Sequence, residues 1–229
     1  MVVSTGVDAP SEIRVASWGF PHVEHGFGRR DRPVASGFHL VRSRQVHGDD
    51  VVVVDGSSAS PAGDADGMLT ATRGVAVGIA TADCVPVLLA APEAGVVAAV
   101  HAGWRGSLLG IVPRTIDLLR DRFGVEPASV RAALGPSIGG CCYEIEREIA
   151  ARFADRFGEG VWTAWKPGAA GKGTLDLRTV NERLLVEAGL PAAAVSRAGP
   201  CTACGGEDLA SYRKQGPRAG RQVSWIGLR

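Results

Sequence analysis

The sequence predicts an α+β domain in which mixed β-sheets are flanked by helices. Short apolar runs that are adjacent in the sequence are typical of strands, and they mix with later, longer amphipathic segments that are typical of helices. A chain of 229 residues, 45% of them hydrophobic, is long enough to bury one substantial core. No internal repeat, low-complexity tract or long linker divides it. We therefore expect a single domain over residues 1–229.

The first strands are indicated by β-branched and apolar runs at residues 51–54 and 75–80, which we expect to be buried. Residues 55–66 between them are rich in Gly, Ser, Ala and Pro, as is typical of a surface loop.

Two further apolar runs, residues 85–91 and 96–100, are separated by a Pro-Glu-Ala-Gly segment that favours a hairpin connection. Cys84 opens the first run and His101 closes the second. If the runs pair antiparallel, the thiol and the imidazole meet in space.

The first helix is predicted over residues 107–122, which carry apolar residues at helical spacing and end before Gly124. Pro113 should kink this helix or delay its start. A strand at residues 130–134 is expected to follow.

The second amphipathic segment, residues 144–157, ends at Gly158. Asp176 is placed to cap a third helix through Ala188, with Gly189 as its terminator. The last strand candidates are residues 194–196 and 222–228.

Composition excludes several classes of function. The 25 Lys and Arg residues balance 24 Asp and Glu residues, so no net field steers the protein to nucleic acid or an anionic membrane. The first ten residues lack a secretory signal, and the apolar region 84–100 is interrupted by prolines and an acid. We expect a cytoplasmic protein with a small-molecule partner and five cysteines that are not in disulfides. Whether it is a monomer or a homodimer stays open.

Three scattered residues, His47, Cys84 and His101, match the number and type of protein ligands at a catalytic zinc centre. Each stands beside a flexible or element-ending position, so the three side chains could converge on one cleft. Taken alone, the spacing leaves ordinary packing or surface roles open for each of them.

Several ordered motifs resemble the laccase-domain family, which is also called YfiH-like, multicopper polyphenol oxidase or peptidoglycan editing factor. The matching motifs span most of the chain and are Gln45-Val46-His47-Gly48, Thr81-Ala82-Asp83-Cys84-Val85-Pro86, His101-Ala102-Gly103-Trp104-Arg105-Gly106, Gly135-Pro136-Ser137-Ile138-Gly139, Cys142-Tyr143-Glu144, Asp176-Leu177, Cys201-Thr202, Ser211-Tyr212-Arg213 and Gly220-Arg221. The resemblance implies a cysteine-hydrolase-type fold and zinc bound by His47, Cys84 and His101.

The same resemblance implies phosphorolysis of adenosine, inosine and methylthioadenosine, together with deamination of adenosine. We expect Arg105 to hold phosphate or the leaving base, and Gln45 and Asp83 to orient ligands or the nucleophile. For Arg105 and Asp83, a buried ion pair is the structural alternative.

Other functions remain open at this point. In a cysteine-type amidase that edits peptidoglycan precursors, Cys84 would be the nucleophile and His101 the base. A purely structural zinc site would need a fourth protein ligand, and none is obvious in the sequence. Copper-dependent phenol oxidation needs several copper ions and more than the five histidines present, so we regard copper as adventitious.

Two regions depart from a simple match. Family members carry a longer segment with Ser-Leu-Asn and Asn-Arg signatures before the Gln-Val-His motif, and neither occurs here, so nucleoside preference stays open.

The other four cysteines receive no functional assignment. For the adjacent Cys141 and Cys142 we expect partial burial, for Cys201 a structural role, and for Cys204 no particular role.

Overall fold

A computed structural model describes residues 12–32, 34 and 37–229 of the chain. Residues 1–11, which include the segment where no secretory signal is expected, lie outside the described residues. Within the described part, no helix has the length and apolar character needed to cross a membrane.

The two large sheets contain the strands that position the functional site. The five-stranded sheet has the order β1 (Glu12–Ile13), β2 (Val23–Gly28), β14 (Gln222–Leu228), β6 (Val75–Thr81) and β3 (His39–Val41). The six-stranded sheet has the order β13 (Val195–Arg197), β9 (Arg131–Leu134), β7 (Val85–Ala91), β8 (Val96–Ala102), β5 (Gly67–Thr70) and β4 (Val51–Val53).

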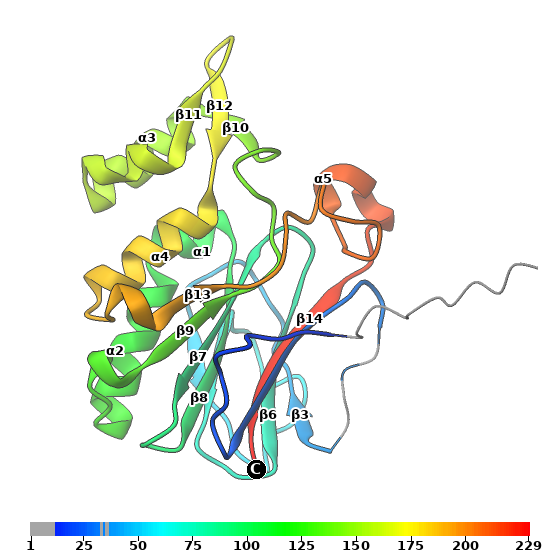
Figure 1. Cartoon of the computed structure of the whole chain (residues 1–229), viewed down its shortest axis with the longest axis vertical. Helices are drawn as coiled ribbons and strands as arrows, with labels where there is room; N and C mark the ends of the chain where they lie inside the picture. Colours follow the sequence, from blue (N-terminus) through cyan, green and yellow to red (C-terminus); the bar gives the residue numbers. More distant parts are fainter. Residues whose placement is uncertain (1–11, 33, 35–36) are drawn as a thin grey trace, which may run out of the picture.

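A small antiparallel sheet of β10 (Glu144–Glu146), β12 (Lys172–Leu175) and β11 (Trp165–Pro167) stands at the top in Figure 1. In the large sheets, the parallel pairs β3–β6, β4–β5 and β13–β9 occur beside antiparallel ones. The predicted α+β class with mixed sheets is therefore confirmed.

The α-helices are α1 (Trp104–Leu109), α2 (Ile111–Phe123), α3 (Arg147–Phe157), α4 (Leu177–Glu187) and α5 (Tyr212–Gln215). Short 3₁₀ turns are η1 (Pro127–Ser129), η2 (Glu159–Ala164), η3 (Ala192–Ala194) and η4 (Gly216–Arg218). Helices α1, α2 and α4 cover one face of the six-stranded sheet, and the five-stranded sheet covers the other (Figure 1).

Strand β7 shows how this layering is encoded. Val87 and Leu89 belong to the core shared with the helices, whereas Leu88 and Ala90 belong to the core shared with the five-stranded sheet. Because both faces of the strand are covered, every residue of β7 is buried, and its sequence is a continuous apolar run without alternation.

The runs predicted as strands at residues 51–54 and 75–80 both form strands, but only the second is buried throughout most of its length. The first becomes β4, whose Val53 side chain is 43% exposed. The expectation of a buried strand was wrong here because β4 forms an edge of its sheet.

The helix predicted over residues 107–122 differs in its start and continuity. It begins at Trp104 and breaks at Gly110, whose left-handed backbone (φ 89°) ends α1 and precedes α2. Pro113 then lies in the first turn of α2, where its missing N–H costs no helical hydrogen bond.

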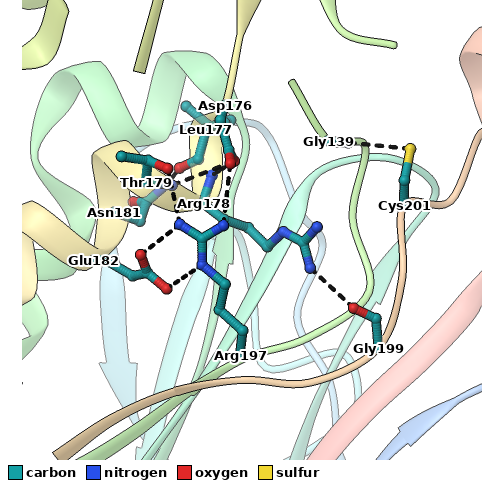
Figure 2. Close-up of polar contacts among 10 residues, drawn as sticks. All are labelled: Gly139, Asp176, Leu177, Arg178, Thr179, Asn181, Glu182, Arg197, Gly199 and Cys201. Carbon is teal, nitrogen blue, oxygen red and sulfur yellow. Dashed lines mark hydrogen bonds and ion pairs between the residues drawn. The ribbon is translucent and has the colours of Figure 1, made fainter. Parts of the chain in front are cut away.

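The later helices follow the sequence signals more closely. Residues 144–146 pair with β12 as a strand, so the helix predicted from Glu144 starts at Arg147 and ends at Gly158. The Asp176 carboxylate accepts hydrogen bonds from the Arg178 and Thr179 amides at the start of α4, as expected of an N-cap (Figure 2).

We expect Gly135→Ala to destabilise the fold where the residue after β9 packs against Phe27 of β2. A Cβ at Gly135 would lie 2.1 Å from Cδ1 of the buried Phe27 ring, and such overpacking costs about 1–3 kcal/mol of unfolding free energy. Urea unfolding measures the change. The matched control is Gly56→Ala, because a Cβ there meets no atom within 4 Å. Equal stabilities of the two variants would contradict the expectation.

Candidate metal centre and active site

Cys84 and His101 meet at one end of the β7–β8 hairpin, as their positions in the sequence predict. The strands pair antiparallel with Pro86 opposite His101, which puts the residue preceding β7 beside the end of β8. His47 approaches from the loop after β3, and its ring meets the His101 ring edge-on with centroids 4.9 Å apart. The candidate ligand atoms of His47, Cys84 and His101 all lie within 4.8 Å of one another.

A residue without a sequence signal, Asp66, holds this group in place. Its fully buried carboxylate accepts hydrogen bonds from the amides of Val46 (3.0 Å), His47 (3.0 Å) and Gly48 (2.8 Å). The same carboxylate contacts Nδ1 of His101 at 2.6 Å. One carboxylate therefore fixes the His47 loop and sets the orientation of the His101 ring, leaving Nε2 of His101 directed away from Asp66.

The loop that Asp66 binds is conformationally strained. His47 adopts a left-handed backbone with φ 61°, which is uncommon for a residue with a side chain. Three hydrogen bonds from consecutive amides to Asp66 offset this cost. The backbone thus presents the imidazole of His47 to Cys84 and His101.

Glycines in the segment after His101 allow close packing around the group. A Cβ on Gly103 would lie 3.1 Å from the sulfur of Cys84 and 3.4 Å from Cδ2 of His47. A Cβ on Gly106 would lie 2.8 Å from the carbonyl oxygen of Gly48. Helix α1 can therefore begin directly behind the three side chains.

The three side chains perturb one another's protonation. Burial opposes the Cys84 thiolate, but hydrogen bonds with His101 and His47 lower the pKa of Cys84 to about 6. Burial also opposes the His101 cation, yet hydrogen bonds with Asp66 and Cys84 raise the pKa of His101 to about 9. In the protein without metal, the Cys84 thiolate and the His101 imidazolium thus stabilise each other's charged form.

The group opens into a cavity of about 480 Å³ that His47, Cys84 and His101 partly line. This volume lies within the usual range for small-molecule sites, about 300–1,000 Å³. The remaining lining residues are Gln45, Ala80, Thr81, Ala82, Asp83, Ile138, Tyr143, Tyr212, Arg213 and Arg221.

Two tyrosines and two arginines also line the cavity. The Arg213 guanidinium lies 5.3 Å from the centre of the Tyr143 ring and donates to the carbonyl of Glu144 at 2.9 Å. Burial, followed by the nearby Cys84, raises the pKa of Tyr143 to about 12, so its hydroxyl keeps its proton at neutral pH. Tyr212 is 55% exposed at the same cavity.

Asp83 and Gln45 line the cavity, and their side chains form hydrogen bonds with other residues of the chain. The Asp83 carboxylate accepts from the Thr202 hydroxyl and from the Arg213 amide, both at 2.6 Å. Asp83, which precedes Cys84, is thus connected to the start of α5, and it forms no ion pair with Arg105. The amide of Gln45 makes two 2.8 Å hydrogen bonds with the backbone of Ala80.

Arg105 is not brought into the cavity lining. It is exposed on α1, where its guanidinium lies 4.9 Å from the centre of the Trp104 ring. The cavity instead contains Arg213 and Arg221, which belong to motifs late in the sequence.

Sequence reasoning assigned no role to Asp66 or to the cavity residues Tyr143, Tyr212, Arg213 and Arg221. Asp66 follows a polar, Gly-rich loop and precedes β5, and such a position carries no catalytic pattern. The donors that Asp66 satisfies are mostly backbone amides, which any sequence supplies. Tyr143 stands beside Cys142 in a recognised motif, but nothing in the sequence directs its ring toward Cys84.

The chain is similar to known proteins in family, sequence and fold. The family model described as multi-copper polyphenol oxidoreductase laccase matches residues 29–229. A purine nucleoside phosphorylase of Deinococcus radiodurans is 40% identical over 189 residues, which are 82% of this chain and 70% of the relative. The protein named adenosine deaminase RL5, from an unknown prokaryotic organism, is 33% identical over 195 residues, or 82% and 74% of the two chains.

Among solved structures, the YfiH protein of Bacillus licheniformis superposes with a TM-score of 0.87 at 29% identity, covering 97% of this chain and 98% of that one. The structural similarity therefore extends over nearly the whole chain. The names of the sequence relatives describe enzymes acting on purine nucleosides. From the extent of the family match, the chain belongs to the family described as multi-copper polyphenol oxidoreductase laccase.

Proposed function

We propose that this protein is a zinc-dependent purine nucleoside phosphorylase that also deaminates adenosine. The observation that carries the proposal is the convergence of His47, Cys84 and His101 at the wall of a cavity large enough for a nucleoside. The names of the relatives, purine nucleoside phosphorylase and adenosine deaminase, support the same substrate class.

The donor set fits zinc. Two imidazoles and one thiolate are ligands that Zn²⁺ prefers, and three protein ligands are typical of a catalytic site with one open position. Among the described residues, the ligand group here consists of these three, and the cavity lies on its open side. When bound, zinc would act as a Lewis acid that lowers the pKa of water and polarises a substrate atom.

The cavity residues supply the other requirements of phosphorolysis. A phosphate oxygen must form a bond to the anomeric carbon of the ribose while the bond from that carbon to the purine breaks and the purine gains a proton. The guanidinium groups of Arg213 and Arg221 provide an anion site for phosphate. The hydroxyl of Tyr143, protonated at neutral pH, is a hydrogen-bond donor for the departing purine, and the exposed ring of Tyr212 offers a stacking surface.

A cysteine-type amidase is a second candidate, because Asp66, His101 and Cys84 lie in the order of an acid–base–nucleophile triad. The Asp66–His101 hydrogen bond of 2.6 Å and the low pKa of Cys84 would both suit a thiolate nucleophile. That reading gives His47 no role, although the protein holds His47 in a left-handed conformation against the same carboxylate. The zinc proposal accounts for all three side chains.

The metal ligands can be tested by site-specific protection. We expect zinc to protect Cys84 from alkylation, and His47→Ala to weaken this protection about 100-fold because it removes a ligand. Asp66→Asn should weaken it about 10- to 100-fold, since an amide cannot accept from three backbone N–H groups and still orient His101. Mass spectrometry of the Cys84 peptide against free zinc gives the affinity.

The matched control for Asp66→Asn is Asp64→Asn. Asp64 lies two residues before Asp66, and its exposed carboxylate pairs with Arg44. This control should leave the zinc affinity unchanged. Unaltered protection in His47→Ala would remove His47 from the ligand set.

The two proposed reactions can be distinguished because only phosphorolysis requires phosphate. With zinc, adenosine and phosphate, we expect adenine and ribose 1-phosphate, whereas without phosphate only inosine should form. Arg213→Ala should raise KM for phosphate about tenfold or more, because a charged hydrogen-bond donor is lost, and should leave deamination less affected. Chromatography of the products measures both reactions.

Arg105→Ala is the comparison variant, because Arg105 lies outside the cavity lining. A larger effect of Arg105→Ala than of Arg213→Ala would assign the phosphate to the residue expected from the sequence. If zinc-loaded protein forms neither adenine nor inosine from adenosine, the proposed function is wrong.

The pH dependence of alkylation separates the two candidate functions. In metal-free protein, the lowered pKa of Cys84 leaves the thiolate populated above about pH 6 and lost as the pH falls through this value. The rate of Cys84 alkylation should therefore rise through about pH 6, and His101→Ala should shift the rise to higher pH. The amidase requires the same reactive thiolate in zinc-loaded protein, where we expect it to be masked.

A further inference from the structure

A second group of potential metal ligands consists of the four cysteines outside the active site. Cys141 and Cys142 belong to the segment between β9 and β10, and Cys201 and Cys204 follow β13. Their sulfur atoms all lie within 4.8 Å of one another, and those of Cys141 and Cys204 are 3.6 Å apart. Cys201 and Cys204 have Cys-x-x-Cys spacing, and the fold places the adjacent Cys141 and Cys142 beside them.

The backbone brings these two segments together independently of the thiols. Ser137 and Cys201 form a parallel β-bridge, and the Thr202 amide donates to the Ser137 carbonyl at 3.0 Å. The Gly139 amide donates to the sulfur of Cys201 at 3.2 Å, as Figure 2 shows. The register of two chain segments thus determines where the four sulfurs meet.

We propose that Cys141, Cys142, Cys201 and Cys204 bind one zinc ion in a closed tetrathiolate site. A tetrahedron with Zn–S bonds of about 2.3 Å has sulfur–sulfur edges of about 3.8 Å. The observed 3.6 Å edge and the 4.8 Å upper limit need only small side-chain adjustments to reach this geometry. Four protein ligands leave no position for substrate, so the site is structural.

The four thiols of the cluster differ in how readily they ionise. Burial opposes ionisation of Cys201, but hydrogen bonds from the backbone of Gly139, Cys204 and Ala203 lower its pKa to about 7. Burial and the neighbouring Cys204 instead raise the pKa values of Cys141 and Cys142. Cysteine binds zinc as the thiolate, so zinc binding at this cluster would release the thiol protons.

The proposed zinc site would restrain two chain segments next to the active-site cavity. Two neighbours of the cluster, Ile138 and Tyr143, line that cavity. On the other segment, the hydroxyl of Thr202 binds the carboxylate of Asp83, which precedes Cys84. Zinc at the four cysteines would therefore restrain both segments relative to the catalytic cysteine without touching substrate.

The test counts metal in a chain whose first site is disabled. In a His47→Ala/Cys84→Ala background, we expect one zinc ion per chain by elemental analysis after purification in reductant. The cobalt-substituted protein should have the intense visible bands and sulfur-to-cobalt charge transfer of a tetrahedral tetrathiolate. Adding Cys204→Ser should lower zinc affinity at least about 100-fold. Adding Ala203→Ser, which introduces the same side chain one residue earlier, should have no effect.

A second measurement uses the unaltered chain and so does not depend on the folding of variants. Zinc should slow alkylation of all four cluster cysteines about tenfold or more relative to chelator-treated protein, as read from their separate peptides. Equal rates with and without zinc would overturn the proposal. A metal-free double variant, or a Cys141–Cys204 disulfide in protein kept under reductant, would also overturn it. None of these results depends on nucleoside turnover, so the proposed function is tested separately.

Discussion

The buried carboxylate of Asp66 is the constraint on which the arrangement of the site depends. A charge removed from water is costly unless it is fully hydrogen-bonded, and Asp66 meets this condition with three consecutive amides and the ring of His101. The interaction connects two elements that are far apart in the sequence, the loop after β3 and the end of β8. Losing it would release the strained backbone of His47 and the orientation of His101 together.

The β7–β8 hairpin is the rigid part of the site. The side chains proposed to contact substrate lie on the segments around it. Both strands are buried on both faces, so Cys84 and His101 stand on a platform that cannot shift without disturbing two cores. Arg213 lies on the short helix α5 and Tyr143 on a connecting segment, and Asp83 binds both the Arg213 amide and the Thr202 hydroxyl beside this platform. Such a division between a fixed reactive centre and adaptable walls would suit the proposed use of several related nucleosides.

The sequence predicts those features that depend on local pattern. Apolar runs located the central hairpin, and with it the meeting of Cys84 and His101; Asp176 located the start of α4. Long-range features carry no such pattern. Asp66 binds mostly backbone donors, the strand at residues 144–146 exists only because β12 pairs with it, and the four cysteines meet because of a bridge between distant segments. Arg105 was favoured by its nearness to His101 in the sequence, yet α1 leaves it outside the cavity lining.

The position of β14 has a consequence for biosynthesis. This late strand lies between β2 and β6 and pairs with both. On a translating ribosome, β2 emerges early and cannot complete its sheet until nearly all of the following residues have been made. Pairing across such sequence separations slows folding, and an incomplete sheet exposes unpaired strand edges. The nascent chain therefore passes through an interval in which the central strands of the six-stranded sheet can pair while β2 and β6 still lack β14 between them, and this interval is when chaperones would matter most.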